Sequence, residues 1–221
     1  MATLKLNSYE LFTQSENNKP EFGAGVPAGC MLNIESAWFN NQLSYNTADG
    51  TGFSSVNGSP ISSAGFSVVP SLTYVTLTAK QSNSRYYLNF TGNISTSTES
   101  NLGDWIGGFG FLVDTNGETS WQHVGAGVNV NYPSNVKYFL SRASATGGGN
   151  DGYYSMQLAG NFLYTSNVTS GNNIRFAIEY FHYDNGYHEY LYINRTHVNP
   201  QSIQPYSGGL ATTFTVMEIA A

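Results

Sequence analysis

The sequence contains few charged residues and a single cysteine. Charged residues make up 10% of the 221 positions and give a net charge of −6, whereas about a quarter of an average soluble protein is charged. The 8 basic residues are scattered singly, so the chain lacks the basic stripe that binds nucleic-acid phosphates. Cys30 has no second cysteine to pair with, which excludes a disulfide within the chain and a cysteine-based zinc site. We therefore expect no nucleic-acid partner, and stability that comes from packing and association.

Long apolar runs and helical periodicity are also absent. The sequence has no apolar run of the roughly 18 residues that a membrane-spanning helix requires, so we expect no membrane insertion. Apolar residues alternate with polar ones or gather in short groups, and Gly, Asn, Ser and Pro interrupt them at intervals of about ten residues. This pattern predicts an all-β fold, an antiparallel β-sandwich or jelly roll. The expected strands are 3–6, 30–38, 74–79, 86–92, 108–114, 121–130, 137–140, 153–158, 174–183, 187–193 and 211–219.

Glycine and serine are concentrated between residues 49 and 70, and this segment has few apolar anchors. The residues before it supply too little apolar surface for an independent domain. We therefore expect two parts, residues 1–70 with N-terminal strands and the Gly/Ser-rich segment, and residues 71–221 with the main sandwich.

Aromatic residues are abundant, and they are densest between residues 175 and 193. Asn185-Gly186 lies in this stretch and is the strongest short signal for a two-residue hairpin turn. The resulting register would pair Tyr180 with Leu191 and place both on a core-facing side with Ile178 and Ile193. The other side would be an aromatic surface, suited to a subunit interface or to saccharide binding. It would comprise Glu179, Phe181, Tyr183, His188, Tyr190 and Tyr192.

Residues 107–123 form the second expected hairpin, around Asn116-Gly117. A turn centred there pairs Leu112 with Trp121, and a register shifted by two residues is the alternative. Aromatic rings that stack on a sugar and polar groups that bind its hydroxyls are both available here. We expect this site to include Trp105, Asp114, Trp121 and His123. The alternative is that both tryptophans fill the ends of the sandwich.

Catalytic and metal-binding patterns are weak. Glu179 and Glu189 could act as an acid and base pair on a glycosidic bond, but the expected hairpin places them on opposite faces. His182 faces Glu189 in that register, and such a pair is more often structural than catalytic. The sequence has no G-x-S-x-G nucleophile motif, and its Asn-Gly turns lack the remainder of a calcium-binding loop. We therefore expect no catalytic residue, no metal and no cofactor.

Four segments in this order resemble the layout of an adenovirus fibre head. They are LTYVTLTAKQSNSRYYLNFTGN at 72–93, GFGFLVDTNG at 108–117, YYSMQLAGNF at 153–162 and the final strand ATTFTVMEI at 211–219. The Thr-Leu-Trp-Thr tetrapeptide of the mammalian viruses is absent, which favours a divergent viral or phage head. The resemblance implies a homotrimeric antiparallel β-sandwich at the tip of a fibre on the virion surface. Residues 1–70 would then be the end of a shaft or an elaboration of the head.

Three functions follow as hypotheses. The first is a non-enzymatic attachment protein that binds a host cell-surface receptor, either a glycan or a protein. The second is a soluble lectin without a secretion signal, of the fungal cytosolic kind, and the third is a glycan-degrading enzyme. Assembly separates the first two, because a fibre head is a stable trimer, whereas turnover of a glycan would identify the third.

Overall fold

The computed structural model describes residues 3–6, 9–14, 20–22, 26–46, 65–68, 74–96, 105–115, 121–124, 139–143, 156–183, 190–194 and 211–221. Every regular element among them is a β-strand, and their pairings are antiparallel. The predicted all-β antiparallel fold is therefore confirmed. This described part of the chain contains no helix long and apolar enough to cross a membrane.

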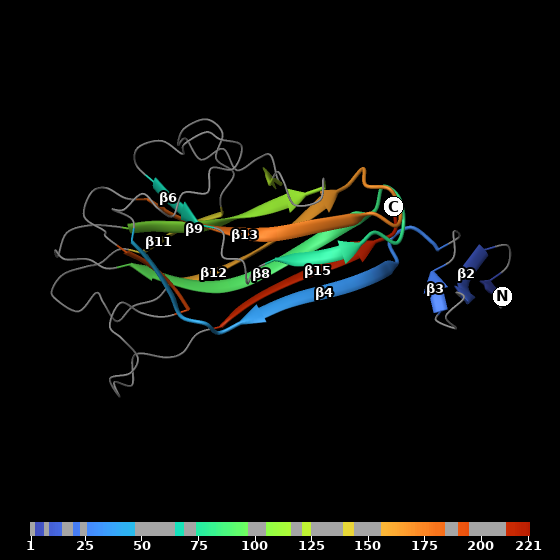
Figure 1. Cartoon of the computed structure of the whole chain (residues 1–221), viewed down its shortest axis with the longest axis horizontal. Helices are drawn as coiled ribbons and strands as arrows, with labels where there is room; N and C mark the ends of the chain where they lie inside the picture. The colour runs from blue at the N-terminus through green and yellow to red at the C-terminus, as the bar shows by residue number, and fades with distance from the viewer. Residues whose placement is uncertain are drawn as a thin grey trace.

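Two six-stranded sheets form the two layers of the sandwich (Figure 1). Sheet I has the order β4-β15-β8-β14-β5, and β12 pairs with β8. Its strands are β4 (Met31–Phe39), β5 (Leu43–Asn46), β8 (Arg85–Thr96), β12 (Met156–Thr165), β14 (Tyr190–Ile193) and β15 (Thr212–Ile219).

Sheet II has the order β10-β9-β13-β6, with β11 on β9 and β7 on β13. Its strands are β6 (Gly65–Val68), β7 (Val75–Thr78), β9 (Trp105–Asp114), β10 (Gln122–His123), β11 (Phe139–Ala143) and β13 (Asn173–Tyr183). A third sheet lies beyond one end of the sandwich (Figure 1) and contains β1 (Thr3–Leu6), β2 (Tyr9–Gln14) and β3 (Pro20–Phe22). Strands β4, β5 and β6 precede residue 70 and still lie in sheets I and II, whereas the division of the chain at that residue stays a prediction.

The core lies between sheets I and II, because alternate side chains of each strand point to the same face. From sheet I, β8 and β15 contribute Leu88, Phe90 and Phe214, and all three are fully buried. Phe90 meets Phe109 of sheet II with 4.4 Å between the ring centroids. Burial of such side chains stabilises the fold by roughly 1.5–3 kcal/mol each.

The expected hairpin between residues 175 and 193 is wrong. Strand β13 belongs to sheet II and β14 to sheet I, where β14 pairs with β5 and β8. Both edges of β13 are already occupied, one by β9 and the other by β6 and β7. The chain therefore crosses between the layers after Tyr183, and the turn preference of Asn185-Gly186, which lies outside the described residues, does not decide the pairing.

The expected core-facing side chains of that stretch are nevertheless buried. Ile178, Tyr180, Leu191 and Ile193 all have 0% exposure and belong to one core cluster. The expected aromatic surface does not exist as one face, because Tyr192 lies in sheet I with 7% exposure and Glu179 is fully buried in sheet II.

The second hairpin adopts the shifted register. Gln122 pairs with Val113 and His123 with Leu112, which is two residues away from the pairing that a turn centred on Asn116-Gly117 gives. The turn itself lies outside the described residues.

A buried asparagine joins the two sheets. Asn194 follows β14 with a φ of 58° and 0% exposure. Its Nδ2 donates to the backbone oxygens of Phe39 and Asn41, both at 3.3 Å, and its Oδ1 accepts from Thr212 Oγ1 at 2.8 Å. The Thr212 hydroxyl also lies 3.1 Å from the hydroxyl of Tyr180. This network fixes the ends of β4, β14 and β15 to β13 in the other layer.

Candidate functional site

An arginine brings two of the predicted site residues together on the outer face of sheet II. Arg175 Nη2 donates to Asp114 Oδ2 at 2.9 Å, and the side chain of Asp114 is fully buried. The Arg175 guanidinium carbon also lies 4.8 Å from the ring centroid of Trp121 and 5.7 Å from that of Tyr74. Such cation–π contacts contribute about 0.5–2 kcal/mol each.

This arrangement restricts what Asp114 and Trp121 can offer a ligand. The Asp114 carboxylate is bonded to Arg175, and the arginine covers part of the Trp121 ring, which is half-buried. The ring of Trp121 also contacts Tyr74, with 5.1 Å between centroids. These contacts favour a structural role for the pair, and stacking of a sugar on Trp121 stays a prediction.

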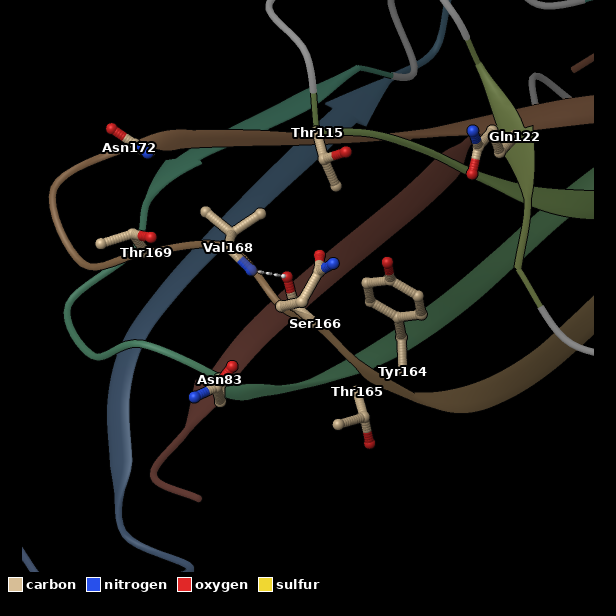
Figure 2. Close-up of a pocket in the computed structure, with 10 residues that line it drawn as sticks. Asn83, Thr115, Gln122, Tyr164, Thr165, Ser166, Val168, Thr169 and Asn172 are labelled. Carbon is tan, nitrogen blue, oxygen red and sulfur yellow. Dashed lines mark hydrogen bonds between the residues drawn. The ribbon is translucent and has the colours of Figure 1, made fainter.

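A groove of about 870 Å³ opens between the sheets, on the other side of β10 from Trp121. Gln122 pairs with Val113, a core-facing residue, and therefore points between the layers. Tyr164 of β12 points between them from the opposite sheet, because it pairs with the buried Tyr86. Figure 2 shows Tyr164 and Ser166 on one side of this space and Thr115 on the other, with the Tyr164 hydroxyl directed toward the side of Thr115.

The groove is lined by uncharged polar side chains. Among the described residues that line it, Val168 is the single aliphatic one, and none is ionic at neutral pH. The lining residues are Asn83, Thr115, Gln122, Tyr164, Thr165, Ser166, Asn167, Val168, Thr169 and Asn172. Amides and hydroxyls both donate and accept hydrogen bonds, so such a surface suits a neutral ligand with many hydroxyl groups.

Two connections, 79–84 and 166–172, form one wall of the groove. Asn83 N donates to Val168 O at 3.2 Å, and Ser166 N donates to the backbone oxygen of Ser84 at 3.1 Å. Within the second connection, Ser166 Oγ accepts from Val168 N at 3.0 Å (Figure 2). Asn83 adopts a left-handed φ of 61°, which asparagine tolerates better than most residues. The backbone of this wall is thus fixed by hydrogen bonds before any ligand arrives.

Glu218 supports the same wall from the C-terminal strand. One carboxyl oxygen, Oε1, accepts from Lys80 N at 2.8 Å, Gln81 N at 3.1 Å and Ser84 Oγ at 2.8 Å. Because Glu218 is fully buried, these three donors are held against β15. The 80–84 turn is therefore held both by Glu218 of β15 and by the neighbouring 166–172 connection.

Tyr164 is the single aromatic side chain in the lining. Its ring meets Phe176 edge-on, with 5.9 Å between centroids. Burial raises the pKa of the Tyr164 phenol above its ordinary value. The hydroxyl is therefore neutral at physiological pH and can both donate and accept a hydrogen bond.

The other predicted site residues are dispersed. Trp105 begins β9 and Asp114 ends it, so the rise of a strand separates the two backbones by about 30 Å. His123 lies on β10 opposite Leu112.

The predicted aromatic surface supplied the other candidate binding residues, and these are divided between the sheets. Tyr183 ends β13 opposite Gly65, whereas Tyr190 and Tyr192 lie on β14 opposite Asn46 and Ser44. His188 lies outside the described residues.

Sequence reasoning missed the groove. Its lining comes from four separate segments, and each of them reads as an ordinary turn or strand end. The one available signal was the polar run from Ser166 to Asn172 between two strands.

The described residues hold no cluster of three or more His, Cys, Asp or Glu side chains that could bind a metal ion. The absence of a cofactor stays a prediction.

Comparisons with known proteins identify no family. No family model matches the chain, and no curated protein does. The chain is similar to the structure of infectious bursal disease virus Gx strain, with a TM-score of 0.35 and 11% identity over 96% of this chain and 42% of that chain. For the Gt strain of the same virus the TM-score is 0.27 and the identity 10%, over 93% of this chain and 45% of that one. The chain thus spans less than half the length of either.

Proposed function

We propose that this protein is a non-enzymatic attachment protein, the homotrimeric head of a viral or phage fibre, and that it binds a cell-surface glycan in the groove between its sheets. The observation that carries the proposal is the chemistry of the described residues that line the groove, which are amides, hydroxyls, one aliphatic residue and one tyrosine ring, with no ionic group among them. Hydrogen bonds to sugar hydroxyls and one aromatic contact need these groups. A phosphate or a nucleotide would require cationic groups that this lining does not have.

The same lining supports binding without turnover. Among the described residues that line the groove there is no carboxyl, imidazole or thiol group to act as an acid, base or nucleophile. A groove with one aromatic side chain also predicts a weak single site. Several heads or subunits would then have to engage a cell surface together, because linked sites gain affinity from effective concentration.

A glycan array with the purified chain tests the proposal, followed by calorimetric titration of the best ligand. Tyr164→Phe removes one hydroxyl and leaves the packing on Phe176 intact, and Asn167→Ala removes an exposed amide of the lining. We expect each to weaken binding by about tenfold, the loss of one net hydrogen bond. Asn40→Ala, an exposed amide that does not line the groove, is the matched control.

Four results would contradict this assignment. Unchanged affinity in both groove variants would place the ligand elsewhere, and an array without any bound glycan would favour a protein receptor. Hydrolysis of a bound glycan would instead support an enzyme. A monomer or dimer that still binds sugar would favour the soluble lectin.

A further inference from the structure

The outer face of sheet I carries the large apolar side chains that are exposed in the described part of the chain. Met31, Ile34 and Trp38 of β4 are 53%, 46% and 64% exposed, and Leu163 of β12 is 47% exposed. These side chains lie outside the core of the sandwich, because the alternate residues of the same strands face it. Exposed apolar groups that gather on one surface mark an interaction site, whereas scattered ones do not.

The strand register places these side chains on one surface. Ile34 pairs with Met217, Met217 with Tyr87 and Tyr87 with Leu163. Directly paired residues of antiparallel strands point to the same face. An apolar row, Ile34-Met217-Tyr87-Leu163, therefore crosses β4, β15, β8 and β12.

The remainder of this face is polar but almost uncharged. A row of amides and hydroxyls runs beside the apolar row, and in it Ser36 Oγ and Thr215 Oγ1 lie 2.9 Å apart. Trp38 lies in the row beyond, opposite Thr213. Arg85 is the single ionic side chain among the residues paired across these four strands on this face, and its Nη2 donates to Ala220 O at 3.3 Å.

We infer that a second copy of this chain covers the outer face of sheet I. Copies of a chain with a net charge of −6 repel one another, and they can approach most closely through a face without acidic side chains. Amides and hydroxyls can pair with their own kind across a symmetric contact, because each both donates and accepts. A strongly charged partner, in contrast, would find only the single charge of Arg85 among the paired residues of this face.

The size of the face fits a subunit contact. Four strands about 4.8 Å apart, over about eight residues each, give a flat area of roughly 500 Å² before side-chain relief is added. This is of the order of the ~800 Å² that each partner contributes to a stable interface. The inference concerns the assembly part of the proposed function and does not depend on a ligand in the groove.

Light scattering coupled to size exclusion tests the inference over a roughly hundredfold range of protein concentration, because association follows mass action. We expect the unmodified chain to be a trimer, as in the proposed function. A dimer that both variants dissociate would support this face as the contact and would contradict the trimeric head. The double variant Ile34→Thr with Leu163→Thr removes both ends of the apolar row and keeps residues that suit a strand. It should raise the dissociation constant at least about tenfold and shift the protein to the monomer.

A second variant and a control complete the experiment. Asn89→Lys places a charge on the exposed centre of the polar row, where symmetric copies would repel each other, and it should also give a monomer. Glu35→Thr changes an exposed residue of β4 that points to the other side of the strand and should leave the assembly unchanged.

A monomeric unmodified chain would overturn the inference, and so would an oligomer that survives both variants. If the chain is a monomer, and the double variant no longer binds a glycan that the unmodified chain binds on the array, this face binds the glycan and not a second copy. If the monomeric variants still bind the glycan of the unmodified chain, the interface is supported and the groove is tested separately.

Discussion

Replacement of Asp114 by asparagine distinguishes a structural role from a ligand-binding one. The side chain is fully buried, and its Oδ2 accepts from Arg175 Nη2 at 2.9 Å, while the arginine is 12% exposed. Removal of one partner of a buried pair typically costs about 3–5 kcal/mol. The slight exposure of Arg175 and its contacts with Trp121 and Tyr74 reduce this cost. We expect the free energy of unfolding to fall by about 2–4 kcal/mol.

Urea unfolding, followed by far-ultraviolet circular dichroism, measures this loss. Glu35→Gln makes the same chemical change at an exposed position and should cost less than about 0.5 kcal/mol. Arg175→Met in the Asp114→Asn background removes both charges and should recover part of the loss, and the double-mutant cycle gives the coupling energy. A cost for Asp114→Asn no larger than that of the control, with weaker glycan binding, would refute the structural role.

Three further predictions concern the core and the wall of the groove. Glu218→Gln keeps an acceptor for the 80–84 turn but removes the charge that strengthens its three hydrogen bonds, and urea unfolding should show a loss of about 2 kcal/mol. Gly92→Ala should lower the melting temperature and cost about 1–3 kcal/mol, because the new Cβ would lie 2.6 Å from Phe90 Cζ in the core. Burial, the charge of Glu218 and the Tyr164 phenol raise the pKa of Tyr86 above 10.0. As the pH rises, the unfolded chain therefore loses the phenol proton before the folded chain does. The free energy of unfolding should hold to about pH 10 and then fall by up to about 1.4 kcal/mol for each further pH unit. Tyr86→Phe should flatten that decline in urea titrations between pH 9 and about 11.

Most strands could be predicted because one face of each is buried and the other is not. The segments 75–78 and 85–94 largely alternate between apolar and polar side chains, and this period defines a half-buried strand. The strands β2, β3, β5 and β6 were not predicted. Leu43–Asn46 and Gly65–Val68 are short and lie beside or within a Gly/Ser-rich segment, so they carry too few apolar residues to show a period.

The partner of each strand was harder to predict than the strand itself. Asn185-Gly186 favours a tight turn on local grounds, but the pairing depends on which strand edges are free once the sheets form. Strand β13 has β9 on one edge and β6 and β7 on the other. For the strand that contains Trp121, by contrast, the shifted register considered from sequence is the observed one. A shift of two residues keeps every side chain on its face of the sheet, whereas a shift of one would move each to the opposite face.

The groove could not be predicted for a related reason. Asn83, Thr115, Gln122 and the 164–172 segment are far apart in the sequence, and they meet where strand ends and turns of both sheets line the groove. An apolar period reports which side chains face the core, but it gives no information on which strand ends and turns become neighbours.

The hydrogen bonds of Asn194 have a consequence for how the protein can be produced. Asn194-Arg195-Thr196 and Asn167-Val168-Thr169 both match the acceptor motif for N-linked glycosylation. In a eukaryotic secretory pathway the oligosaccharide is attached to amides that are accessible, and the folded chain buries the Asn194 amide against Phe39 and Asn41. A sugar added there before folding would keep β14 from its place beside β8, whereas one on the exposed Asn167 would occupy the groove. Expression in the bacterial cytoplasm avoids both outcomes, and a secreted preparation is expected to fold poorly and to bind no glycan.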